Sequence, residues 1–60
     1  MKVTFSEYFT DAAMWNKTRD FTVDMKDPYP ILSALGFKET NHGTYWRQTA
    51  YNEAEGAVIN

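Results

Sequence analysis

The chain has no cysteine, only one histidine, three glycines and two prolines among its 60 residues. Without cysteine, neither a disulfide nor a thiolate metal site can stabilise the fold, and a single histidine cannot build a structural zinc centre. We therefore expect no metal and no cofactor. A domain this short buries only about 60% of the surface of its unfolded chain, so its stability has to come from one small core.

The sequence also lacks a strong charge of either sign, because eight acidic and six basic residues give a net charge of −2. This balance provides no field that would attract nucleic acid phosphates or an anionic membrane, and it is too weak to imitate a phosphate backbone. No segment approaches the ~20 apolar residues of a membrane span, and no apolar run of a signal peptide follows the N-terminus. We expect a cytoplasmic protein without a membrane or nucleic acid partner.

Aromatic side chains, in contrast, are abundant and make up 17% of the sequence. Each brings roughly 150 to 250 Å² of surface that could be buried, which is more than a core of this size can hold. Exposed apolar patches on small proteins tend to be interaction sites. We therefore expect some aromatic residues to face another protein or a second copy of the chain.

The clearest local signal is a helix with a start and a stop. Asp27 precedes Pro28, and an aspartate in this position can accept hydrogen bonds from the free N–H groups of the first turn. Gly36 can adopt the left-handed conformation that ends a helix, after which Phe37 can fold back onto Leu32. The pattern predicts a helix of about two turns that presents three apolar residues to a sheet, Ile31, Leu32 and Leu35.

Residues 1–16 fit two different periodicities. Thr4 followed by Glu7 is a capping box, and a helix would also accommodate Trp15 better than a loop would. Four apolar residues also recur at helical spacing: Phe5, Tyr8, Phe9 and Ala12. We predict a helix over residues 5–15 for these reasons. An extended strand is the alternative, and it would place three apolar residues on one face, Val3, Phe5 and Phe9.

Three segments predict strands. Residues 18–25 alternate between apolar and polar side chains in strict period two, which is typical of a strand with one solvated face. Residues 37–40 and 44–49 are both rich in strand formers. Asn41-His42-Gly43 between them tolerates positive φ, so this region predicts a hairpin.

The C-terminal segment is more polar. Residues 51–56 predict an acidic loop, and residues 57–59 predict a last short strand at the edge of the sheet. Together these elements predict an α+β fold with one compact domain over residues 1–60. We expect a small antiparallel sheet of three to four strands packed against one or two short helices.

Residues that could carry out chemistry are few. His42 is the only histidine, a residue type that often acts as a general acid or base, and it lies at the predicted hairpin tip, but no nucleophile or carboxylate is adjacent to it in the sequence. Asp20, Asp24 and Asp27 lack the glycine and terminal glutamate of a calcium loop. We therefore expect no enzyme, no catalytic residue and no metal site.

Binding is a better prediction, and it centres on Tyr45-Trp46-Arg47. Tryptophan, tyrosine and arginine are the residue types enriched at interface hot spots. Either Tyr45 or Trp46 should pack on the predicted helix, which would leave the other exposed. We add Tyr29 and Trp15 as further candidate binding residues.

The order of a helix, Gly36-Phe37, a strand, His42-Gly43 and a second strand resembles the HicA family of small mRNA-cleaving toxins. The resemblance covers the second half of the chain and implies an RNA-directed role for His42. Three departures limit it: the family's histidine follows the turn glycine, its closing helix is missing, and residues 1–26 have no counterpart. We treat it as a shared local topology, which does not transfer function.

Our leading expectation is a non-enzymatic protein that docks onto another protein as an inhibitor or adaptor. By analogy, small bacteriophage accessory proteins that act on host enzymes or defence systems have this profile. We also expect a homodimer, formed by edge pairing of residues 57–59. The alternative is an RNA-binding or RNA-cleaving protein that uses the sheet and His42, with phosphates bound by three basic residues, Arg19, Lys38 and Arg47.

Overall fold

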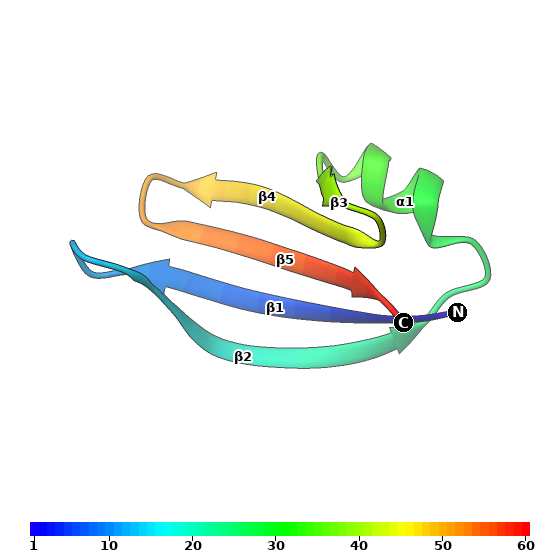
Figure 1. Cartoon of the computed structure of the whole chain (residues 1–60), viewed down its shortest axis with the longest axis horizontal. Helices are drawn as coiled ribbons and strands as arrows, with labels where there is room; N and C mark the ends of the chain where they lie inside the picture. The colour runs from blue at the N-terminus through cyan, green and yellow to red at the C-terminus, as the bar shows by residue number, and fades with distance from the viewer.

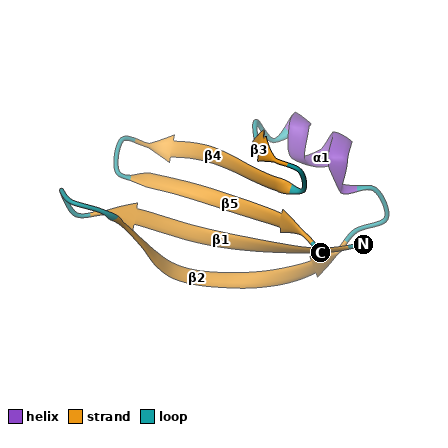
Figure 2. Ribbon diagram, viewed as in Figure 1, coloured by secondary structure: helices purple, strands orange, loops and turns teal.

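The computed structural model describes residues 1–60 and contains one antiparallel sheet with one helix (Figure 1, Figure 2). The elements in chain order are β1 (Lys2–Thr10), β2 (Trp15–Asp24), α1 (Pro28–Ala34), β3 (Lys38–Asn41), β4 (Thr44–Ala50) and β5 (Glu53–Ile59). The sheet order is β2-β1-β5-β4-β3. The α+β class is confirmed, but the sheet has five strands and only one helix accompanies it. That helix is too short to cross a membrane.

The predicted helix over residues 5–15 is wrong, because β1 runs through its first half. β1 pairs with β2 on one side and with β5 on the other, so its backbone groups are satisfied by two neighbouring strands. These pairings outweigh the local helical spacing of the apolar residues. Trp15 begins β2 with 44% of its surface exposed, so the argument that it would avoid water also failed.

β5 corrects two further predictions. It begins at Glu53, so the acidic loop predicted over residues 51–56 shrinks to the two residues Tyr51 and Asn52. β5 is also the central strand of the sheet, with β1 and β4 as its neighbours. Residues 57–59 therefore offer no free edge, and the dimer predicted from their edge pairing cannot form.

The core lies between α1 and one face of the sheet. Five buried residues form it: Val3, Leu32, Phe37, Tyr45 and Ala57. α1 contributes Leu32, which is fully buried, while Ile31 and Leu35 are 44% and 48% exposed. The prediction that all three face the sheet is thus correct only for Leu32, since a helix of seven residues contacts the sheet along one narrow stripe.

The predicted ends of α1 are largely confirmed. At the start, Asp27 is the N-cap and has extended backbone angles, but its side chain makes no capping hydrogen bond. At the end, Gly36 has a φ of 89° and the Phe37 N–H donates to the Leu32 carbonyl at 3.0 Å. This reversal brings Phe37 back over the helix and into the core, as predicted.

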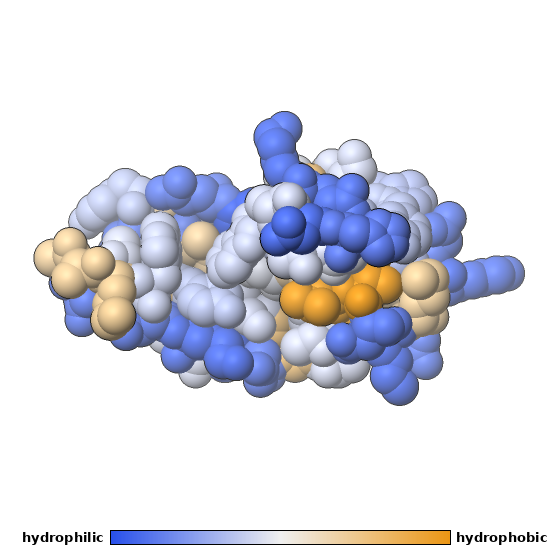
Figure 3. Space-filling model, viewed as in Figure 1, coloured by the Kyte–Doolittle hydropathy of each residue, from blue (hydrophilic) through white to orange (hydrophobic).

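The predicted strand over 18–25 and the predicted hairpin are confirmed as β2 and as β3 with β4. Gly43 in the hairpin turn has a φ of 80°, which explains why a glycine stands there. Several large apolar side chains remain exposed, and of the ten aromatic residues only Phe37 and Tyr45 are buried. Figure 3 shows one side of the molecule, on which a small apolar patch is bordered above and below by hydrophilic side chains.

Candidate functional site

Strand alternation divides the sheet into two faces. One face contacts α1; we call the other the helix-free face. Residues directly opposite each other in neighbouring strands share a face, so the register identifies the central members of the helix-free face. These are Thr4, Ser6, Tyr8 and Thr10 of β1, Ala54, Gly56 and Val58 of β5, and Thr44, Trp46 and Gln48 of β4.

Two aromatic rings meet over the middle of this face. The ring centroids of Tyr8 and Trp46 lie 5.0 Å apart, with 47° between the ring planes. Both rings lie against Gly56, where a Cβ atom would be 3.5 Å from the Trp46 ring and 3.6 Å from Cε2 of Tyr8. Because the central strand has no side chain at this position, rings from β1 and β4 can approach each other across it. We call Tyr8 and Trp46 the aromatic pair.

A shallow groove of about 310 Å³ adjoins the aromatic pair. It is lined by Trp15, Trp46, Arg47, Gln48 and Ala54. Trp15 and Trp46 are 44% and 37% exposed, so both indoles remain available to a partner. The groove is large enough to receive one or two side chains of a partner protein.

The central part of the helix-free face carries no charge. Between Thr4 and Thr10 of β1, and along β4 and β5, the residues on this face are hydroxyl, amide, aromatic or aliphatic. We call this region the uncharged strip. The charged residues of the face lie at its margins: Lys17, Asp20 and Asp24 on β2, Lys38 on β3 and Lys2 at the end of β1.

The marginal charges are mostly paired within the chain. Lys17 Nζ donates to Asp20 at 3.0 Å, and this hydrogen bond is the main cause of the raised pKa of Lys17. Asp24 lies 3.8 Å from Lys2 and 3.3 Å from the N-terminal amino group. An uncharged centre with polar margins is the usual anatomy of a protein interface.

The run Tyr45-Trp46-Arg47 is split by strand alternation. Tyr45 belongs to the core and is only 7% exposed, so it cannot meet a partner. Trp46 is the exposed member of the two, a choice that the sequence left open, and Trp15 lines the same groove. Tyr29 lies on α1, away from both. Tyr8 was missed, although the strand alternative for residues 1–16 would have placed it opposite the apolar face.

The side chain of Arg47 lies on the α1 side of the sheet, where it contacts three groups of the fold. Its Nε donates to Glu55 at 3.0 Å, its Nη2 also contacts that carboxylate, and its Nη1 donates to the Leu35 carbonyl at 2.7 Å. Its guanidinium also lies over the Phe37 ring, 4.7 Å from the centroid. These contacts connect β4 and β5 to the end of α1.

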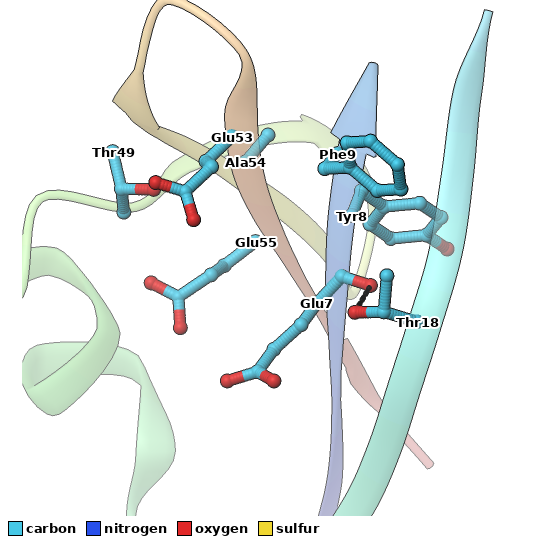
Figure 4. Close-up of a pocket in the computed structure, with 8 residues that line it drawn as sticks. All are labelled: Glu7, Tyr8, Phe9, Thr18, Thr49, Glu53, Ala54 and Glu55. Atoms are coloured by element: carbon cyan, nitrogen blue, oxygen red, sulfur yellow. Dashed lines mark hydrogen bonds between the residues drawn. The ribbon is translucent and has the colours of Figure 1, made fainter. Parts of the chain in front are cut away.

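A second hollow, of about 460 Å³, is lined by residues of β1, β2, β4 and β5 (Figure 4). It is lined in part by three carboxylates, Glu7, Glu53 and Glu55. Glu7 lies 3.5 Å from Arg19, and Glu55 is paired with Arg47. No group of carboxylate and imidazole side chains lies close enough together to hold a metal ion.

His42 lies exposed in the turn between β3 and β4. The next residue, Gly43, donates its N–H to the Glu39 carboxylate at 3.1 Å. The side chain of His42 therefore stands apart from both hollows and from the aromatic pair.

The buried phenol of Tyr45 should make the stability of the fold depend on pH. Burial raises the pKa of its phenol above the ordinary value of about 10, and the nearby Glu39 carboxylate raises it further. The folded state therefore holds this proton more tightly than the unfolded state. Below pH about 10 the contribution of the Tyr45 phenol to the free energy of unfolding is constant. As the pH rises from about 10 through the pKa of the folded state, the free energy of unfolding falls.

Urea unfolding at pH values of about 9 and 11 measures this contribution. We expect a smaller loss of stability between the two pH values for Tyr45→Phe than for the wild type. Tyr51→Phe is the control, because Tyr51 is 88% exposed and should behave as the wild type does. An equal loss in Tyr45→Phe and wild type would show that the phenol of Tyr45 is not responsible.

Comparisons of the chain with models of known families, with characterised proteins and with solved structures found no match. They add no support to the local resemblance to HicA toxins. The function therefore has to be argued from the surface of the molecule.

Proposed function

We propose that this protein is a non-enzymatic docking protein that binds another protein, as an inhibitor or adaptor, through its helix-free face. The observation that carries the proposal is the aromatic pair at the centre of the uncharged strip. By analogy with small bacteriophage accessory proteins, we infer that it acts in the cytoplasm on a host enzyme or defence system.

The physical basis is the low cost of desolvating this surface. Burial of the uncharged strip removes no ionised group from water, so the area of Tyr8, Trp46 and Trp15 contributes without an opposing charge penalty. Tryptophan and tyrosine also lose few torsional degrees of freedom when they are fixed at an interface. The groove beside Trp46 can receive a protruding side chain of the partner.

The geometry favours a protein partner over RNA. Single-stranded nucleic acid needs cations next to the aromatic rings on which its bases stack. Arg47 and Arg19 each pair with a carboxylate, and the register places both on the α1 side of the sheet. On the helix-free face Lys17 is paired with Asp20 and Lys2 with Asp24, so only Lys38 remains without an ion pair.

Affinity capture from a bacterial lysate tests the proposal. We expect the wild type to retain a specific protein and Trp46→Ala to retain it at least about tenfold less, because a central tryptophan of an interface is commonly a hot spot. Tyr29→Ala is the matched control, since Tyr29 is 40% exposed compared with 37% for Trp46 but lies on α1.

Equal capture by Trp46→Ala and wild type would contradict the assignment of this face, as would loss of capture in Tyr29→Ala alone. A mobility-shift assay with single-stranded RNA at low ionic strength tests the other class of partner. Binding that weakens steeply with added salt would favour the RNA-directed role over a protein partner.

A further inference from the structure

We infer that a second copy of this chain covers the helix-free face when no partner is bound, so that two sheets pack face to face with both helices outside. This interface differs from the edge pairing that the central position of β5 excludes. The inference of a dimer does not depend on the proposed function. Only one consequence rests on that proposal, namely that the partner protein and the second copy compete for the same face.

The available area is sufficient for a dimer. A ten-residue strand rises about 3.3 Å per residue, and five strands lie about 4.8 Å apart, so one face covers roughly 600 Å². The molecule measures 37 × 18 × 17 Å, which agrees with a face of this size. Two such faces bury on the order of 1,200 Å², the lower limit for specific protein interfaces.

The two faces of the sheet differ in their suitability for self-association. The α1 side carries the helix and two ion pairs, Glu7 with Arg19 and Glu55 with Arg47, and burial of these charges in an interface would cost desolvation free energy. The helix-free face has the uncharged strip at its centre, where Val58 is 42% exposed and Trp46 37%. Packing this face against itself therefore places apolar surface at the centre of the interface and leaves the carboxylates of Asp20 and Asp24 at its margin.

A two-fold axis parallel to the strands and passing over β5 satisfies the remaining charges. It places β2 of one copy over β3 of the other, because these two strands lie at opposite edges of the sheet. Lys38 of β3, which has no ion pair within its own chain, then lies over the strand that carries Asp20 and Asp24. The contact is the same on both copies, as an isologous interface requires.

The same axis brings the aromatic pairs together. β4 of one copy lies over β1 of the other, and because both rings of each copy meet over Gly56, the two aromatic pairs lie over each other at the axis. Gly56 of both copies lies at the centre, where the absence of side chains lets the rings lie close to the backbone. Sheets packed face to face are about 10 Å apart, a distance that such rings can fill.

Analytical ultracentrifugation of the purified protein, over roughly 1 µM to 1 mM, tests the dimer. We expect the wild type to approach twice the chain mass of 7.0 kDa as the concentration rises. Val58→Lys introduces a charge into the strip and should raise the dissociation constant at least tenfold. Leu35→Lys is the matched control, since Leu35 is 48% exposed at the C-cap of α1, away from the helix-free face, and it should dimerise as the wild type does.

A wild type that remains monomeric over the whole range would overturn the inference. So would a dimer that survives in Val58→Lys, or one that is lost in Leu35→Lys. These measurements use no partner, so a dimer found without any captured protein refutes the proposed function alone, and capture by a strictly monomeric protein refutes the dimer alone.

Tryptophan fluorescence of the wild type provides a second measurement that does not depend on a variant that folds. The two tryptophans of the chain, Trp15 and Trp46, both line the groove of the helix-free face. We expect their emission to shift to longer wavelength on dilution and their quenching by acrylamide to increase. Emission and quenching that do not change with concentration would contradict a dimer through this face.

Discussion

Replacement of Leu32 by alanine is expected to lower the free energy of unfolding by about 2 to 5 kcal/mol. Leu32 is fully buried and is the central apolar contact between α1 and the sheet. Its truncation removes transfer free energy and leaves a cavity between the two layers of the molecule. A 60-residue domain has a total stability of roughly 3 to 9 kcal/mol, so the variant should lose a large share of that stability.

Leu35→Ala is the matched control for this prediction. It makes the same chemical change one turn further along the chain, at a side chain that is 48% exposed, and should cost less than about 1 kcal/mol. Urea denaturation followed by circular dichroism compares the two variants with the wild type. Similar midpoints for Leu32→Ala and Leu35→Ala would mean that α1 does not pack on the sheet through Leu32.

Replacement of Arg47 by alanine is expected to cost about 2 to 3 kcal/mol of stability. The side chain is mostly buried and joins three groups, the Glu55 carboxylate, the Leu35 carbonyl and the Phe37 ring. Its loss leaves the partly buried carboxylate of Glu55 without a cation and frees the end of α1. The sequence pattern predicts a binding role for Arg47, but its contacts predict that its substitution acts mainly on folding.

Arg19 is the control in this case, because it has the same kinds of partner at a more exposed position. Its Nε lies 3.5 Å from Glu7 and its guanidinium 5.1 Å from the Phe21 ring centroid, but its side chain is 64% exposed. Arg19→Ala should therefore cost less than about 1 kcal/mol. Equal losses in the thermal or urea midpoint for the two variants would contradict a structural role that is specific to Arg47.

The parts of the fold that the sequence predicted correctly are those with local signals. Pro28 and Gly36 mark the ends of α1 because proline and glycine restrict or release the backbone wherever they stand. His42-Gly43 marks the hairpin turn for the same reason. The strict alternation of residues 18–25 identified β2, since that segment offers no helical face that could compete with it.

The errors concern the two strands whose state depends on distant partners. Residues 5–15 have helical spacing of apolar residues, and only pairing with β2 and β5 makes residues 2–10 a strand. Glu53 to Gly56 has a loop-like composition, yet the segment lies at the centre of the sheet. Gly56 is needed in this segment because the Tyr8 and Trp46 rings pack against its backbone. Glu55 is needed because it accepts a hydrogen bond from Arg47.

The candidate site could be predicted only in part, because it too depends on which segments pair as strands. Trp46 and Trp15 could be chosen by residue type alone, and the structure places both beside one groove. Tyr8 could be added only once β1 was known to be a strand, since strand alternation puts it on the face of Trp46. The exclusion of Tyr45 from the surface likewise depends on which face of β4 receives α1.

The position of β5 has a consequence for how the molecule is made. The hairpin β1–β2 and the hairpin β3–β4 share no backbone pairing with each other, and β5 alone joins them. During synthesis on the ribosome, the two hairpins emerge first. They cannot join into one sheet until residues 53–59 have left the exit tunnel and can pair with both. Closure of the sheet is therefore a late step that depends on contacts between residues far apart in the chain, such as Val3 and Ile59.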